Sequence, residues 1–589
     1  MSEIPDPTLE LPTALIRTLS FADMNAAAIT RWGEALPLIN TQATSAQLML
    51  ATTELAALDA PAVDRLAYQE AVRPLVHYVC TRLERHAPKT AGTHNLPSAG
   101  NLLINLCVGY KSVVASALAD LKAEKTKDKD LLATAIHRLM SDLARVLNRA
   151  LQNYVPPPQH FWQELNGLFL LCESLNLLDF SRVDEENRYD SPLTIKQVYL
   201  RALLLASCKP NQLNASQLGR VFNVLELWGD VIDLTPMDSE SLLVVDLKTD
   251  EGPKIKQGPR NFVEARSIRV EVLTYELEAY LNGIDGKIEV SENFPEALLR
   301  HLIEAWTTVH PRAFKRLPAD TPVRVAVGMR ASHYFLSGGY DFNDQYRTNQ
   351  DLLRREINPF LDLDYERPDE KDPWSKIYGD GGQNARDSVN TPTESANNSI
   401  KAGTTEQRDA EPYHHFLTQA LDSSANGYRI EWLEPLPPKT KVGELIALRE
   451  ETATRWFMAT IRWLRQQNQR FIMGVELLSP KAIPVAIRTI QTRGGSAEFS
   501  RAFLLPAVSA LGKEATIITP PLPFQSRQKV YIQRQSIEST AQLLTLQQNT
   551  ESFNQFTFRM LDGYLENSRA DSNIDSLSRM TKRDSSKEP

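Results

Sequence analysis

The chain has 589 residues, of which 65 are Lys or Arg and 73 are Asp or Glu, so its formal net charge is -8. This length exceeds what a single hydrophobic core organises, and it predicts three or four domains. The acidic balance argues against general affinity for nucleic acids or anionic membranes, because such binding requires a net basic surface. An anionic ligand must therefore find a local cluster of cations.

The four cysteines lie within apolar helical patterns and form no CxxC pair. This placement predicts reduced core residues of a cytoplasmic protein. The N-terminus is acidic and lacks the basic and apolar regions of a signal peptide, and no uninterrupted apolar run is long enough to cross a bilayer. We expect a cytoplasmic protein without direct membrane insertion, which partners recruit to the inner membrane face or the cell pole.

Helical periodicity dominates the first part of the chain, residues 1–236. Its clearest segment runs over residues 131–154, ends before three prolines at 156–158, and places on one stripe Leu132, Ile136, Leu139, Leu143, Val146 and Leu147. We predict an all-α domain here, either a solenoid or a bundle. Residues 237–310 predict an α+β connector, because β-branched runs at 242–247 and 268–272 precede a helix from Phe294 to about His310.

Strand patterns dominate the second half of the chain. Runs at 322–328, 427–432, 443–448, 455–464 and 471–478 predict five short strands of a β-barrel within residues 311–490. A polar insert at about 337–412 splits this barrel, and its composition predicts disorder. Residues 491–566 predict a second small β-domain, and 567–589 a disordered tail. The predicted fold class is therefore α+β multidomain: an N-terminal all-α helical domain, a split β-barrel and a second small β-domain.

Two short motifs flank the insert. The first is RxxxR, formed by Arg312 and Arg316, and the second is DxSxxG, formed by Asp422, Ser424 and Gly427. In this order the pair resembles the ligand-binding signature of PilZ domains, small β-barrels that bind the bacterial second messenger cyclic di-GMP. The resemblance implies that all five residues contact the nucleotide.

The residue types suit a ligand with two phosphates and two guanines. A guanidinium can bind phosphate through two bonds, pair with the guanine edge or stack on a base. Asp422 can accept hydrogen bonds from guanine N1–H and N2–H2, and Ser424 can donate or accept nearby. We expect Gly427 to supply a positive φ and room for close approach of the ligand. Arg324 or Arg330 would add to the positive field.

Letter matching alone does not select these motifs, because the helical half contains a second pair. Arg145 and Arg149 also form RxxxR, and residues 214–219 fit the DxSxxG pattern with Asn214 in the first position. However, Arg145 and Arg149 fall on what we predict to be one solvated face of a helix. Asn214 and Ser216 precede a helix and indicate a capping segment. By contrast, Arg312 and Arg316 stand directly before a predicted strand, and Gly427 begins one.

The distance between the motifs departs from the PilZ pattern, in which a few tens of residues separate them, whereas here about a hundred intervene. The insert accounts for this length, since closing a longer loop costs only about 0.6 kcal/mol per doubling. The organisation of the whole chain is similar to large PilZ receptors of proteobacteria, which are linked to surface attachment and type IV pili. This similarity implies a protein partner such as the pilus or motility machinery.

Parts of the sequence also resemble two other classes of function. Gly338–Phe342 and the EAL triplets at 34–36 and 296–298 superficially match enzymes of cyclic di-GMP turnover, but they lack the carboxylates that metal-dependent catalysis needs. We predict no catalytic residue, no metal site and no cofactor other than the ligand. The remaining alternative is a ligand-free PilZ-like scaffold that acts through protein contacts of the helical domain.

Overall fold

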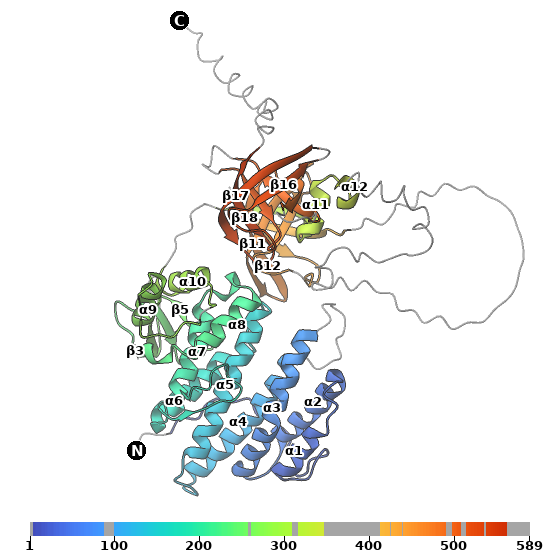
Figure 1. Ribbon diagram of the computed structural model, residues 1–589. Helices are drawn as coiled ribbons and strands as arrows, with labels where there is room; N and C mark the ends of the chain where they lie inside the picture. The colour runs from blue at the N-terminus through green and yellow to red at the C-terminus, as the bar shows by residue number, and fades with distance from the viewer. Residues whose placement is uncertain are drawn as a thin grey trace, which may run out of the picture. The chain divides into compact units, whose positions relative to one another are not determined.

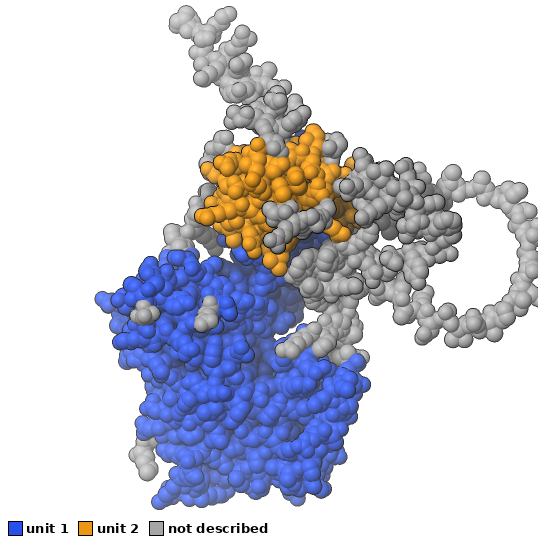
Figure 2. Space-filling model, in the orientation of Figure 1, with its two compact units in different colours: residues 1–332, 416–482, 549–553 blue, residues 333–415, 483–548, 554–589 orange. Residues whose placement is uncertain are grey.

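The computed structural model describes residues 4–86, 99–256, 261–284, 286–291, 293–308, 316–346, 413–424, 426–438, 440–490, 497–507, 514–534 and 537–561. The chain forms two compact units. The first comprises residues 1–332, 416–482 and 549–553, and the second comprises 333–415, 483–548 and 554–589 (Figure 2). Arg312, the remainder of the insert from 347 to 412 and the tail from 562 lie outside the described residues.

The N-terminal part is helical, as predicted. Among the described residues its elements are α1 (Ala26–Glu34), α2 (Thr41–Ala57), α3 (Ala62–His86), α4 (Ala99–Lys122), α5 (Asp130–Gln152), α6 (Phe161–Leu175), the short strands β1 (Ser181–Arg182) and β2 (Leu193–Thr194), α7 (Ile195–Ser207), η1 (Pro210–Gln212), α8 (Ala215–Val224) and η2 (Gly229–Val231). Helices α3, α4 and α5 pack side by side (Figure 1). The apolar stripe of α5 lies in their shared core.

Helix α4 corrects one expectation from the sequence. By length and composition it could cross a membrane, whereas no such segment was expected. Its apolar stretch is 67 % buried inside the protein, where it contacts α2, α3 and α5. A helix that packs against three neighbours buries most of its surface, which accounts for an apolar stretch of this length inside the protein.

The connector is a four-stranded sheet with two helices. The sheet has the order β3-β6-β4-β5, and the elements are β3 (Asp233–Pro236), β4 (Leu243–Asp246), β5 (Lys254–Ile255), β6 (Ala265–Arg269), α9 (Glu271–Leu281) and α10 (Glu296–Thr307). Its buried residues Leu273, Leu298 and Trp306 belong to the same hydrophobic core as the helices before it. The boundary expected at 236 therefore does not separate two cores. Helix α10 ends at Thr307, before the expected end at His310.

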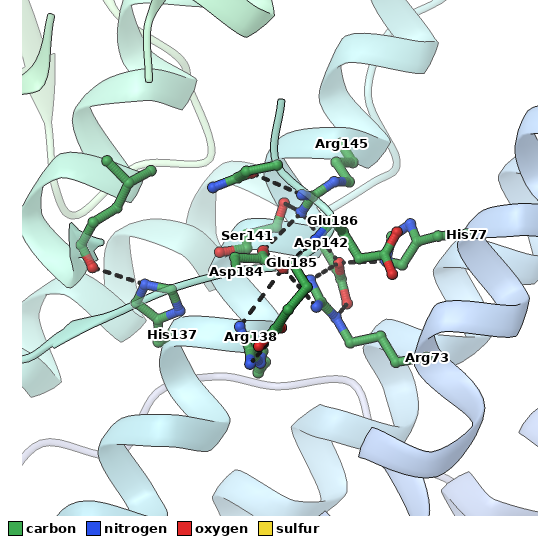
Figure 3. A network of polar contacts seen from close by, with 12 residues as sticks. Arg73, His77, His137, Arg138, Ser141, Asp142, Arg145, Asp184, Glu185 and Glu186 are labelled. Atoms are coloured by element: carbon green, nitrogen blue, oxygen red, sulfur yellow. Dashed lines mark hydrogen bonds and ion pairs between the residues drawn. The ribbon is translucent and has the colours of Figure 1, made fainter. Parts of the chain in front are cut away.

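A buried charged network joins α3 and α5 to the segment that follows α6 (Figure 3). Arg73 donates to Asp142 at 2.9 and 3.0 Å and to Asp184 at 2.7 and 2.9 Å. Arg145 Nη1 lies 3.2 Å from Asp184 Oδ2. Burial alone would raise the pKa of both carboxyl groups, but the surrounding guanidinium groups hold each pKa well below its usual range.

The first barrel is closed and has six strands in the order β10-β11-β12-β9-β8-β7, with β7 pairing β10. The strands are β7 (Leu317–Val327), β8 (Phe416–Ser424), β9 (Gly427–Trp432), β10 (Leu445–Glu450), β11 (Phe457–Gln467) and β12 (Arg470–Ser479). Five of them were predicted. The sixth, β8, was missed because it directly follows the polar insert and ends in Asp-Ser-Ser.

Tyr154, which follows α5, contacts this barrel. Its hydroxyl accepts a hydrogen bond from Val442 N at 3.1 Å, and its carbonyl accepts one from Gln466 N at 2.7 Å. The side chain packs against the barrel core. Helix α5 and strand β11 are thus joined within the first unit.

The second unit contains another closed six-stranded barrel, in the order β13-β14-β15-β18-β17-β16. Its strands are β13 (Ile483–Thr489), β14 (Ser500–Leu505), β15 (Thr516–Thr519), β16 (Lys529–Arg534), β17 (Ile537–Asn549) and β18 (Asn554–Met560). The predicted fold class, a helical region followed by two small β-domains, is confirmed. The boundary expected at 490 is corrected, because β13 pairs with β14 and β16 of this second barrel.

The start of the expected insert is folded, which corrects its predicted boundary at 337. Helix α11 (Met329–Leu336) is followed by α12 (Phe342–Tyr346), whose Phe342 and Tyr346 pack with Ala486 of β13. His333 is fully buried beside Phe342 and Phe503, and its ring nitrogen lies 3.3 Å from the Val485 carbonyl oxygen. Burial, together with the nearby Arg501 cation, lowers the pKa of His333 to about 3.

Candidate functional site

The two halves of the motif pair meet on the first barrel. Arg316 immediately precedes β7, and Asp422 lies near the end of β8, where it is paired with Pro318 of β7. The guanidinium Nη1 of Arg316 donates to Asp422 Oδ1 at 2.7 Å across 106 residues of sequence. Antiparallel pairing of β7 with β8 therefore brings together residues that the insert separates.

Arg429 of β9 is a second cation at this carboxylate. Its Nε lies 2.9 Å from Asp422 Oδ2, an ion pair without hydrogen-bond geometry. The Asp422 side chain is only 12 % exposed, whereas those of Arg316 and Arg429 are 36 % and 39 % exposed. Two partly exposed guanidinium groups thus share one largely buried carboxylate. The cluster carries surplus positive charge and can bind an anion at the surface.

Ser424 and Gly427 form the turn between β8 and β9. Ser424 ends β8, Gly427 begins β9, and the Ser424 hydroxyl donates to the Gly427 carbonyl oxygen at 3.3 Å. A Cβ atom at Gly427 would lie 1.9 Å from the carbonyl oxygen of Val475 in β12. The φ of Gly427 is not in the left-handed region, which corrects our expectation of a positive φ. Glycine is required here because the neighbouring strand passes too close for any side chain.

Arg312 lies outside the described residues, so its role stays a prediction. Of the two further cations considered, Arg324 is located farther along β7, opposite Leu417 of β8, and pairs with Glu451 at 3.4 Å. Arg330 lies in α11. Arg316 and Arg429 are thus the described arginines that contact Asp422.

Comparisons with known proteins cover almost the whole chain. Sequence models match for the N-terminal domain of the cyclic-di-GMP receptor FimW at residues 27–239, for its middle PilZ domain at 242–484 and for its C-terminal β-barrel domain at 485–561. The cyclic-di-GMP receptor FimW of Pseudomonas aeruginosa is 29 % identical over 586 residues, which covers 95 % of this chain and 94 % of that relative. The chain belongs to the FimW family. The PilZ resemblance stated from the two motifs is confirmed at the level of the domain.

The second pair of motif-like sequences is structural. Asn214 caps α8 with its side chain in a capping box with Gln217, as its position before a helix predicted. Arg149 pairs with Glu84. The prediction of a solvated face for both arginines is wrong for Arg145, because this side chain is buried in the charged network of Figure 3. The apolar period of α5 did not reveal that its polar side also faces protein.

Sequence reasoning missed Arg429, although one signal was available. Arg429 lies two positions after Gly427, and side chains alternate between the two faces of a strand. Ile430 points into the core, so Arg429 points outward with Gly427. Recognising Arg429 also required the pairing with Asp422, which depends on a bulge in β8 between Ala420 and Asp422.

Proposed function

We propose that this chain is a non-enzymatic receptor that binds cyclic di-GMP on the outer face of its PilZ barrel. Arg316 and Arg312 bind phosphate and guanine, Asp422 and Ser424 bind the guanine edge, and Gly427 keeps the β8–β9 turn close to β12. Arg429 completes the cluster by holding Asp422 from the other side. The FimW relative is named a cyclic-di-GMP receptor, which supports the choice of this ligand.

The observation that carries the proposal is the 2.7 Å contact between Arg316 and Asp422. This contact joins RxxxR to DxSxxG, and it leaves an excess of guanidinium charge at a partly exposed position. A phosphate or guanine edge can take over one arginine while the other stays with the carboxylate. The ligand group and the Asp422 carboxylate are then each bound to one guanidinium by charge-assisted hydrogen bonds.

We further propose that ligand binding is relayed to protein partners through the helical region. Tyr154 supports this route, because it connects α5 to the turn at Val442 and to Gln466 of β11. Binding of the ligand would order the outer face of the barrel. This ordering would shift the equilibrium between the formed and broken Tyr154 contact, and so change the surface that the helices present to a partner. Surface attachment and pilus-dependent behaviour are the outputs that we propose for this relay.

Calorimetric titration of the full chain with cyclic di-GMP tests the receptor proposal. Arg316→Ala removes charge-assisted hydrogen bonds worth about 1.5–3 kcal/mol in total, so its affinity should fall by about 10- to 150-fold. Arg324→Ala is the matched control, since Arg324 lies in the same barrel and its side chain is 33 % exposed, close to the 36 % of Arg316. The control should bind within about twofold of the unsubstituted chain.

The result that would overturn the receptor proposal is equally direct. If the unsubstituted chain gives no heat with cyclic di-GMP and no shift of its melting temperature, the barrel is a ligand-free scaffold. Equal losses of affinity in Arg316→Ala and Arg324→Ala would show that only general positive charge matters. The assignment of Arg316 to the site would then be wrong.

A further inference from the structure

The two closed barrels have the same strand order. When the strands of each barrel are numbered from one to six along the chain, both rings read one, two, three, six, five, four. In both barrels the first strand pairs with the fourth and closes the ring. The second barrel therefore shares the topology of the PilZ barrel, and positions on its strands can be compared with those of the proposed ligand site.

The row of paired positions that carries Asp422 has a counterpart in the second barrel. In the first barrel, Pro318 is the second residue of β7 and is paired with Asp422, which is paired with Arg429 of β9. In the second barrel, Pro484 is the second residue of β13 and is paired with Phe503 of β14. Phe503 thus occupies the position that corresponds to Asp422.

This row is apolar and buried in the second barrel. Phe503 is paired with Ile518 of β15, the counterpart of the pairing between β8 and β9. The adjacent residues Ala502, Leu504 and Ile517 fill the barrel core. Side chains alternate between the two faces of a strand, so Phe503 and Ile518 point outward. Both are nevertheless 0 % exposed, which shows that protein covers this outer face.

Residues 333–346, which contain the end of α11 and all of α12, cover part of this face (Figure 1). The ring centre of His333 lies 5.5 Å from that of Phe503. The hydroxyl of Tyr346 donates a hydrogen bond to the Pro484 carbonyl oxygen at 3.2 Å. A segment of the connection between β7 and β8 therefore lies on the row that corresponds to the proposed nucleotide site.

The far end of the same connection returns to this segment. The ring of Tyr413 lies 5.3 Å from that of Tyr334, and the ring of His415 lies 5.3 Å from that of Phe335. All four residues belong to the second unit, and β8 begins at the next residue, Phe416. The second unit thus holds both ends of the connection that joins β7 to the strand carrying Asp422.

We propose that the second barrel binds a peptide where the PilZ barrel binds its ligand, and that the bound peptide is residues 333–346 of the same chain. The ligand class is an aromatic segment that packs on apolar side chains and donates hydrogen bonds to carbonyl groups of β13. Through the chain, this binding couples the second barrel to β7 and β8. The inference depends on the shared topology and on these contacts, and it stands independently of nucleotide binding by the first barrel.

Hydrogen exchange of the full chain, followed by mass spectrometry, tests the inference. The double variant Phe342→Ala, Tyr346→Ala removes two buried aromatic side chains from the segment and leaves the barrel sequence intact. Amides of residues 333–346 should exchange about tenfold faster or more, whereas amides of β13 to β18 should stay within about twofold of the unsubstituted chain. Tyr340→Ala is the matched control, since Tyr340 is an aromatic residue of the same segment but is 64 % exposed. It should leave both sets of amides unchanged.

Two results of this experiment would overturn the inference. If the amides of the barrel accelerate as much as those of the segment, residues 333–346 are part of the barrel fold and not a bound peptide. If no amide of the segment accelerates, the contacts of Phe342 and Tyr346 do not hold it. If the double variant does not fold, Tyr346→Phe decides, because it removes only the hydrogen bond to Pro484. Faster exchange of the segment then supports the inference, and unaltered exchange refutes it.

Titration of the same variants with cyclic di-GMP separates peptide binding from a covered nucleotide site. The double variant should bind as many molecules of cyclic di-GMP per chain as the unsubstituted chain does. An additional site in the double variant would show that the segment covers a nucleotide site, which contradicts the proposed peptide site. If neither chain binds cyclic di-GMP, the receptor proposal fails, and the exchange result by itself decides the peptide site.

Discussion

Substitution of Gly427 distinguishes two physical reasons for a glycine at the end of DxSxxG. One reason is backbone freedom, in which glycine supplies a positive φ, and asparagine then replaces it better than alanine does. The other is close approach of another strand, which excludes every side chain. The structure favours the second reason, because an added Cβ would lie 1.9 Å from Val475 O, 3.0 Å from Val475 C and 3.3 Å from Glu476 Cα.

The size of the effect follows from those contacts. The separation from Val475 O must grow from 1.9 Å to at least 3.0 Å, and all three neighbouring atoms belong to the backbone of β12. Strand β9 or β12 must therefore shift, since no side chain can rotate away. Overpacking of this kind costs about 1–3 kcal/mol or more. For a domain of 150–250 residues this corresponds to a fall in melting temperature of about 2–12 °C.

The assay compares Gly427→Ala and Gly427→Asn by thermal unfolding and by hydrogen exchange at the amides of β9 and β12. Both variants should be destabilised to a similar extent, and both should bind cyclic di-GMP more weakly because the pairing of Asp422 with Arg429 shifts. Gly283 is the matched control, since its φ is +71° and a Cβ there meets nothing within 4 Å. Gly283→Asn should be tolerated better than Gly283→Ala.

A different ranking at Gly427 would refute this reasoning. If Gly427→Asn keeps the melting temperature and affinity of the unsubstituted chain while Gly427→Ala loses them, backbone freedom and not strand contact explains the glycine. The register of Gly427 opposite Glu476 would then be wrong as well.

Three further predictions concern the rest of the chain. Asp184→Asn removes a carboxylate that neutralises buried guanidinium charge, so it should lower the free energy of unfolding by about 3–5 kcal/mol. The control Asp233→Asn breaks an exposed ion pair and should lower it by at most about 1 kcal/mol. Chemical unfolding measures both values. The pKa of His333 is about 3 in the folded protein and about 6.5 in the unfolded chain. The contribution of neutral His333 to stability is therefore complete above about pH 6.5 and is lost as the pH falls toward 3. In His333→Phe the melting temperature should depend less on pH between about 6.5 and 3. Tyr154→Phe removes the acceptor of the Val442 amide, whose hydrogen exchange should accelerate. Because coupling between two sites is reciprocal, the proposed relay requires that this variant also change the affinity for cyclic di-GMP, and unchanged affinity in calorimetry would contradict the relay.

The fold class could be predicted because its signals are local. Apolar residues at helical spacing mark α5, and β-branched alternation marks five strands of the first barrel. The predicted domain boundaries were less accurate, because contacts between residues far apart in sequence decide them. The helices and the connector share one core, β13 pairs with the second barrel, and α12 packs on β13 although it lies in a polar stretch.

Local sequence context was also enough to recognise that the second pair of motif-like sequences lies in and before helices. A capping asparagine before α8 and arginines within α5 differ from an arginine before a strand, and these differences depend on neighbours in sequence. The sequence therefore determined the domain family and the candidate positions Arg316, Asp422, Ser424 and Gly427. Arg312 stays a prediction on the same basis.

Only the tertiary structure decided how these residues are arranged. The contact of Arg316 with Asp422 and the second cation Arg429 depend on strand register, which a bulge in β8 shifts by one residue. A shift of one residue moves a side chain to the opposite face of a strand, and periodicity alone does not specify where a bulge occurs. For the same reason, only the tertiary structure shows that β12 lies too close to residue 427 for any side chain other than that of glycine.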